Sequence, residues 1–304
     1  MLRGAKRGTP GQNYTMMPRV HKCEAFAALL ALMSPLTCHG TTTIFVITPD
    51  RIVAGTDQLT RGASPEVKGV FRTDINKIQL INGRFIVACI GLEQSAAYSF
   101  PAWVEKIGNK LAPDASVTQF VGLIESEAAR TFKLDMSIEQ YMRSGALVKG
   151  QPFEDTLVEY IVAGYESGVP TVIRTYFQLD WHDKRLVGPE RDVQFPDSGN
   201  NPNVGIQMNG VDGGIGEFNN VNSYAYKRFR SFSPTILDKL VSGREVTQAE
   251  AVSAIRILVS IQAEITPNQV GRGSRVVVLP MRGAVSVSSY PDGPSLHKQR
   301  TASH

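Results

Sequence analysis

Cysteine is almost absent from the main part of this chain, and its scarcity excludes two kinds of site. Of the three cysteines in 304 residues, Cys23 and Cys38 lie within the first forty, which leaves only Cys89 beyond them. A single cysteine cannot form an internal disulfide, and it cannot supply the cysteine cluster of a structural zinc site. We expect neither a metal nor another cofactor.

Histidine is equally scarce where an active site would need it. Among the five histidines, His21 and His39 precede residue 41, and His297 and His304 lie in a polar tail. Only His182 remains within the expected fold. Because a Ser-His-Asp triad uses histidine as its base, this distribution argues against that catalytic arrangement.

The excess of positive charge is confined to the N-terminal forty residues. The formal net charge is +4, and residues 1–40 hold five basic residues and one acidic residue. The rest of the chain therefore carries 27 of the 32 basic and 27 of the 28 acidic residues. A balanced body offers no general attraction for nucleic acid or membrane. The aromatic and basic run at residues 224–230 is interpreted as a half-solvated segment at the edge of the domain.

Residues 1–40 are interpreted as a leader. After Met16 come a basic start, an apolar run over residues 25–33, a proline at position 35, and small residues at Cys38 and Gly40. This order is typical of an export signal cleaved after Gly40, and the apolar run is too short to span a bilayer. A buried amphipathic helix and a propeptide removed by the protein itself stay open. Export predicts a periplasmic or secreted protein, whereas self-processing allows a cytoplasmic one.

Residues 41–290 are expected to form one α+β domain, followed by a disordered polar tail over residues 291–304. The turn signals Pro49-Asp50 and Asn82-Gly83 predict two hairpins. The predicted elements, in order, are strands 42–47, 51–55, 77–81 and 84–90, helices 96–111 and 120–132, strands 157–163 and 171–179, further short strands near 185 and 205, helices 234–240 and from 247, and strands 275–279 and 284–288. Such blocks predict two packed antiparallel sheets with helices outside them, a four-layer α-β-β-α sandwich.

Cleavage after Gly40 would make Thr41 the first residue of the chain. A threonine hydroxyl is a weak nucleophile, and a free α-amine, with a pKa of about 7.7 to 8.0, can serve as its base. A nearby lysine lowers the pKa of the hydroxyl, and an aspartate keeps that lysine charged. A glycine N–H can stabilise an oxyanion by about 3 to 4 kcal/mol. Asp57, Lys77 and Gly91 are the candidates for these three roles.

Each of these residues also has an ordinary structural interpretation, as a strand start, an ion pair or a turn. Together, they resemble the N-terminal nucleophile hydrolases of the proteasome type, the β-subunit and its bacterial relatives. The resemblance is carried by the Gly40-Thr-Thr-Thr43 opening, the strand 52–57, the Asn76-Lys77-Ile78 triplet and the strand end 88–91. The spacings from Thr41 to Asp57 and from Lys77 to Gly91 match without gaps, and the loop between them is longer.

The resemblance implies a role for each residue of the motif. Thr41 would be nucleophile and base, Asp57 and Lys77 its electrostatic support, and the Gly91 N–H the oxyanion donor. Four further residues would lie near the pocket for the substrate side chain: Thr60, Gln79, Cys89 and Glu93. Glu93 would favour a basic group on the substrate. Relatives of this type form rings, so the resemblance also suggests a homo-oligomer.

Two turns depart from the family pattern. The family presents a serine on a Gly-Ser-Gly turn, and here the corresponding segment is Gly210-Val-Asp212-Gly213, which makes Asp212 the candidate replacement. The family also has an Asp-x-x-Ser-Gly turn after the last long helix, whereas residues 267–271 lack both the aspartate and the serine. Two functions stay open: a peptide or amide hydrolase that uses Thr41, and a non-catalytic proteasome-like subunit that assembles or binds.

Overall fold

The protein is described here from a computed structural model. The structure describes residues 37–39, 41–61, 71–72, 76–94, 98–134, 137–144, 155–195, 205–210, 218, 220–267, 270–291 and 294. Most of the predicted leader, including Gly40, lies outside these residues, as do Asp212 and almost all of the predicted polar tail. Thr60 is described through its backbone alone.

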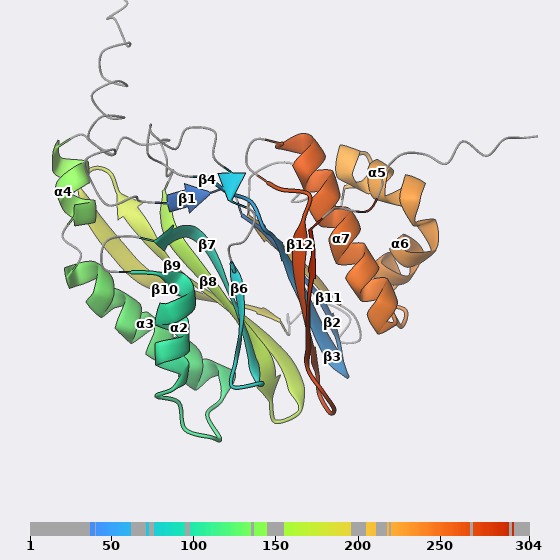
Figure 1. The fold of residues 1–304 in the computed structure, drawn as a ribbon, viewed down its shortest axis with the longest axis horizontal. Coiled ribbons are helices and arrows are strands. Elements are labelled where there is room, and N and C mark those ends of the chain that lie inside the picture. The colour runs from blue at the N-terminus through green and yellow to red at the C-terminus, as the bar shows by residue number, and fades with distance from the viewer. Residues whose placement is uncertain are drawn as a thin grey trace, which may run out of the picture.

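Two antiparallel sheets dominate the fold (Figure 1). The strands of the first sheet are β1 (Thr37–His39), β6 (Ile78–Ile81), β7 (Phe85–Gln94), β8 (Thr156–Glu166), β9 (Val169–Asp180) and β10 (Arg185–Phe195). Their order in the sheet is β1-β7-β8-β9-β10. Strand β6 pairs with the same edge of β7 as β1 does. The second sheet has the order β11-β2-β3-β12-β13, with β11 (Gly205–Gly210), β2 (Thr42–Thr48), β3 (Arg51–Asp57), β12 (Ser274–Pro280) and β13 (Ser286–Tyr290). The short strands β4 (Thr60–Arg61) and β5 (Phe71–Arg72) pair separately.

Helices lie on the outer sides of the two sheets (Figure 1). The first sheet is accompanied by α2 (Phe100–Gly108), α3 (Val117–Leu134) and α4 (Ser137–Ser144), and the second by α5 (Tyr224–Phe232), α6 (Pro234–Val241) and α7 (Gln248–Ile265). Within the described residues, no helix is both long enough and apolar enough to cross a bilayer.

Three apolar clusters separate these layers. In β2, Phe45 belongs to the cluster between the sheets, whereas Val46 packs into the cluster beneath α5–α7. In β7, Ala88 likewise faces the second sheet and Val87 faces α2 and α3. Successive strand residues point to opposite faces, so strands covered on both sides are apolar throughout. The predicted α+β class with two antiparallel sheets is confirmed, and the layering is consistent with the predicted sandwich.

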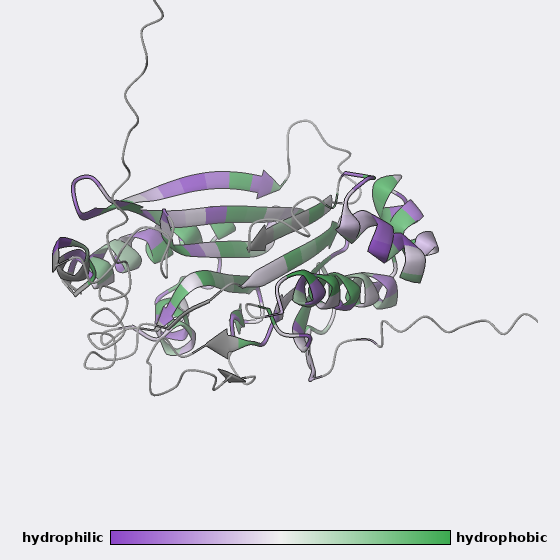
Figure 2. Cartoon of the chain, turned by 90° about the horizontal axis from the view of Figure 1, so that it is seen from above, coloured by the Kyte–Doolittle hydropathy of each residue, from purple (hydrophilic) through white to green (hydrophobic). Residues whose placement is uncertain are grey.

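The outer strand β10 differs from the buried strands. Most of its residues are exposed or half-buried, and Figure 2 shows this edge strand as mainly hydrophilic. Charged residues along an edge strand oppose pairing with another chain. Its sequence therefore fits a sheet that ends at β10.

Five described elements were not predicted from the sequence, and two of them are the short strands β4 and β5. The segment interpreted as a half-solvated edge forms α5, which buries Ala225 and Phe229 and exposes Tyr224. The short helix α4 was also missed. Strand β1 falls within the predicted leader, and it pairs with β7 through backbone hydrogen bonds, which depend little on side-chain pattern.

The start of α7 provides the first testable prediction. The Thr247 hydroxyl accepts a hydrogen bond from the backbone N–H of Glu250, and the Glu250 carboxylate accepts one from the N–H of Thr247, which forms the capping box that the sequence predicts. We expect Thr247→Ala to lower the free energy of unfolding by about 1 kcal/mol in urea titrations. Ser99 is the N-cap residue of α2, but its side chain forms no capping hydrogen bond. Ser99→Ala should therefore change the free energy of unfolding by much less. Equal losses in the two variants would contradict the capping account.

Candidate active site

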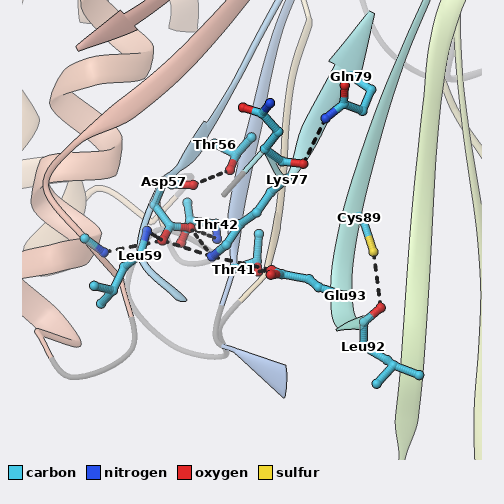
Figure 3. Close-up of polar contacts among 12 residues, drawn as sticks. Thr41, Thr42, Thr56, Asp57, Leu59, Lys77, Gln79, Cys89, Leu92 and Glu93 are labelled. Carbon is cyan, nitrogen blue, oxygen red and sulfur yellow. Dashed lines mark hydrogen bonds and ion pairs between the residues drawn. The ribbon is translucent and has the colours of Figure 1, made fainter. Parts of the chain in front are cut away.

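A buried ion pair forms the centre of the candidate site (Figure 3). Asp57 is the last residue of β3, and Lys77 directly precedes β6. The Lys77 Nζ lies 3.3 Å and 3.2 Å from the two carboxylate oxygens of Asp57. Both side chains are 0% exposed. Because a charge removed from water needs a partner, each side chain offsets the cost of burying the other in this position.

Backbone N–H groups hold the Asp57 carboxylate in place. Its Oδ1 accepts a hydrogen bond from the Thr42 N–H at 3.0 Å, and its Oδ2 accepts one from the Leu59 N–H at 3.0 Å. The Gly271 N–H donates to the same Oδ2 at 3.4 Å. Gly271, in the segment that lacks the aspartate and serine expected from the sequence resemblance, therefore still contributes a backbone donor to the site. The carboxylate is fixed by three different segments of the chain.

Thr41 lies next to this pair, immediately before β2. Its side chain is buried, and its hydroxyl donates a hydrogen bond to Glu93 Oε1 at 3.4 Å. The same Glu93 oxygen lies 3.8 Å from Lys77 Nζ. Thr41, Glu93, Lys77 and Asp57 thus form one continuous series of polar contacts, as Figure 3 shows. The sequence predicted all four as site residues, but it assigned Glu93 to the substrate pocket and missed its contact with Thr41.

The backbone of Gly91 determines the direction in which Glu93 points. Gly91 has a φ of +89°, a left-handed conformation that side-chain-bearing residues rarely adopt. On either side of it, Cys89 and Leu92 both pack into the cluster beneath α2 and α3, although three positions separate them. Regular alternation would place them on opposite faces. The glycine therefore shifts the alternation of β7 by one residue and turns Glu93 towards the second sheet.

Replacing Gly91 gives a second testable prediction. A Cβ at this position would lie 2.5 Å from the Leu157 carbonyl oxygen, whereas a Cβ at Gly83, which also has a positive φ, would meet nothing within 4 Å. We expect Gly91→Ala to lower the free energy of unfolding by about 1–3 kcal/mol more than Gly83→Ala, because only Gly91→Ala adds overpacking to backbone strain. Thermal and urea unfolding of both variants measure this difference. Equal destabilisation of the two variants would contradict this account, because it would show that the contact between the new Cβ and the Leu157 carbonyl oxygen does not lower the free energy of unfolding.

Two of the other residues predicted for the substrate pocket do not face Thr41. Cys89 is turned to the opposite side of β7, where its Sγ lies 3.5 Å from the Leu92 carbonyl oxygen and 3.7 Å from the Tyr98 hydroxyl. Gln79 is half-buried, and its amide nitrogen donates to the Asn76 carbonyl at 3.0 Å (Figure 3). The pocket role predicted for Cys89 does not fit this placement, because residues 88 and 89 face opposite sides of the strand. The Thr60 side chain and Asp212 lie outside the described part of the chain.

Cys89 belongs to a buried polar cluster with two tyrosines. The Tyr160 hydroxyl donates to the Tyr98 hydroxyl at 3.0 Å, and the Tyr98 hydroxyl contacts Cys89. Burial raises the pKa of both tyrosines well above their usual value, so both hydroxyls stay neutral at physiological pH. Trp103 stacks on Tyr160. This cluster stabilises the layer between the first sheet and its helices, away from Thr41.

Among the described residues, no three His, Cys, Asp or Glu side chains are grouped as metal ligands would be. Comparison with models of known protein families and with curated proteins finds no match to this chain. Functional inference therefore rests on the geometry around Thr41. That geometry joins a hydroxyl, a buried ammonium group and two carboxylates, which are groups suited to acyl transfer.

Proposed function

We propose that this chain is a peptide or amide hydrolase whose nucleophile is Thr41, exposed as an N-terminal residue by cleavage after Gly40. We also propose that the chain has the fold of the proteasome-type N-terminal nucleophile hydrolases and belongs to that class. The observation that supports it best is the burial of a Lys77–Asp57 pair beside the threonine that would begin the mature chain. Enclosure makes the Lys77 charge more effective on the hydroxyl than it would be in water.

The mechanism assigns each step to a group in the site. The free α-amine of Thr41 takes the hydroxyl proton, and Oγ1 attacks the carbonyl carbon of the scissile amide. The Gly91 N–H stabilises the oxyanion that forms. The amide nitrogen leaves with the proton from the α-amine, and an ester on Thr41 remains. Water then hydrolyses this ester and restores the hydroxyl. Lys77 lowers the pKa of the hydroxyl throughout, and Asp57 holds Lys77 in position.

The path of the leader supports a substrate that binds in an extended conformation. Thr37–His39 runs antiparallel to β7 and pairs with residues 91–94, so the segment before the proposed cleavage site already lies along this edge. An extended peptide can add to a sheet edge through its main chain. We infer that a substrate uses the same edge after the leader is removed. The pairing of Thr37–His39 with β7 fits a leader that acts as a propeptide. We also propose that the protein is exported and that it forms a homo-oligomer.

A second candidate function is a non-catalytic proteasome-like subunit. It is favoured by the absence of the family's aspartate and serine from residues 267–271. In that case Thr41 would serve only as a buried residue immediately before β2. A free α-amine on Thr41 distinguishes the two functions, because only the hydrolase needs this amine as its base.

The proposed function is tested with two chains that differ by one residue. One begins at Thr41 after removal of a cleavable tag. The other retains Gly40, and intact mass recorded before and after each assay verifies that it has not removed Gly40 by self-cleavage. We expect hydrolysis of a panel of fluorogenic peptides by the first chain alone, because the retained Gly40 converts the amine base into an amide. Equal hydrolysis by both chains, or none by either across the panel, would contradict the proposal.

A further inference from the structure

We propose that Glu93 is the general base that accepts the Thr41 hydroxyl proton when the uncut chain cleaves its own Gly40–Thr41 bond. This inference rests on the proposed function, because it explains how the N-terminal nucleophile is produced. Before cleavage, the nitrogen of Thr41 belongs to a peptide bond and cannot accept a proton at neutral pH. Self-cleavage therefore needs a base different from the one that serves the mature enzyme.

The structure places one carboxylate against the hydroxyl in the uncut chain. Glu93 Oε1 accepts a hydrogen bond from Thr41 Oγ1, with the two atoms 3.4 Å apart. A general base must lie within hydrogen-bond reach of the proton it removes, and this contact can tighten as the reaction begins. The left-handed backbone at Gly91 turns Glu93 to this side of β7. The contact is therefore part of the local fold of the strand.

The neighbouring charged groups are less suited to this role. Both oxygens of Asp57 already accept hydrogen bonds from Lys77 and from backbone N–H groups. Lys77 is an ion-pair partner of two carboxylates, at 3.2 Å from Asp57 and 3.8 Å from Glu93. A charged lysine has no lone pair with which to accept a proton. Its charge can instead stabilise the developing alkoxide.

The proposed step balances in atoms and charge. Glu93 takes the proton from Oγ1 as that oxygen forms a bond with the Gly40 carbonyl carbon in a five-membered ring. The C–N bond to Thr41 then breaks, and the proton passes from Glu93 to the departing nitrogen. The products are a free α-amine and an ester between Gly40 and the Thr41 hydroxyl. Water hydrolyses the ester, releasing the leader with a terminal carboxylate and restoring the hydroxyl.

A purely structural role for Glu93 makes a different prediction. As a second counter-ion of Lys77, Glu93 would matter for stability and for the charge on the lysine, but it would not need to exchange a proton with Thr41. Replacing it would then change folding without a specific effect on the rate and pH dependence of cleavage. The two roles are separated by following cleavage and unfolding in the same variants.

The test follows leader removal from the full chain in a cell-free translation system without membranes, so that no signal peptidase is present. Intact mass is recorded over time for the wild type, Thr41→Ala, Glu93→Gln and Glu93→Asp. We expect wild-type cleavage after Gly40, no cleavage in Thr41→Ala, and cleavage at least about 100-fold slower in Glu93→Gln. Glu93→Asp retains a carboxylate and should recover part of the rate. Urea unfolding verifies that the variants are folded.

The pH profile adds a readout that a structural role would not move. The wild-type rate should rise as the Glu93 carboxylate ionises and then level off, and Glu93→Gln should lose this dependence. Within the described part of the chain, Lys77 faces this carboxylate and Asp57 lies beyond the lysine. A folded Glu93→Gln chain that cleaves within about threefold of the wild type would overturn the base role. A wild-type chain that stays uncut would overturn it as well.

Failure of this inference can be distinguished from failure of the proposed function. If Glu93→Gln cleaves normally while chains beginning at Thr41 hydrolyse peptides, the function stands and the Glu93 role is wrong. If Glu93→Gln blocks cleavage and the mature wild type hydrolyses no amide, the Glu93 role stands and the proposed function is wrong.

Discussion

Replacing Thr41 with alanine is expected to lower amide hydrolysis by about 10⁴-fold or more, because the variant has no atom to form the ester intermediate. The α-amine, Lys77 and Asp57 remain, but they act on the hydroxyl and cannot replace it. The assay compares variant and wild-type chains that both begin at residue 41, using the fluorogenic peptide that the wild type hydrolyses fastest.

Thr43→Val is the matched control for this variant. The Thr43 side chain is also buried on β2, and its hydroxyl forms no hydrogen bond within the part of the chain that the structure describes. Valine has nearly the same shape, so hydrolysis should stay within a few-fold of the wild type. Thr41→Ser, which keeps a hydroxyl, should retain measurable activity. Substantial hydrolysis by Thr41→Ala would assign the reaction to a different nucleophile.

Replacing Lys77 with methionine is expected to remove activity and to lower the free energy of unfolding by about 3–5 kcal/mol. Methionine fills much of the same volume, so the main loss is the positive charge. Asp57 would then lie buried without its cation, and Glu93 would lose the ammonium group at 3.8 Å. Urea titration measures the loss of stability, and the peptide assay measures the loss of activity.

An exposed lysine provides the comparison for Lys77→Met. Lys110 contacts Glu127 at 2.7 Å, but its side chain is 42% exposed, so Lys110→Met should cost less than about 1 kcal/mol. Combining Lys77→Met with Asp57→Leu should recover part of the lost stability, since no unpaired aspartate remains. Similar stability losses in Lys77→Met and Lys110→Met would contradict this prediction. They would mean that water reaches the Lys77–Asp57 pair although both side chains are buried.

The sequence predicted most of the fold because its local signals agree with the tertiary structure. Asn82 and Gly83 both have positive φ, at 52° and 65°, as a tight hairpin between two apolar strands requires. The order of strand and helix blocks also predicted two packed sheets with helices outside them. Helix α5 was missed because its basic and aromatic residues resemble a solvated edge, although Phe229 anchors it in the core.

The candidate site was predicted in composition but not in its contacts. Motif spacing identified Thr41, Asp57 and Lys77, which the fold brings together from three separate strands or strand ends. Spacing could not separate Cys89 from Glu93, because their orientations depend on the change of alternation at Gly91. Nor does any sequence signal indicate that the Gly271 N–H reaches Asp57, 214 positions away. Backbone conformation and long-range approach decide these details.

The N-terminal residue of the active protein tests the central claim most directly. The full chain is expressed and fractionated by peptide-hydrolysing activity, and the active fraction is analysed by intact mass and N-terminal sequencing. We expect a chain that begins at Thr41, with residues 1–40 removed. An active fraction that still begins at Met1 or Met17 would contradict a mechanism in which the α-amine of Thr41 is the base.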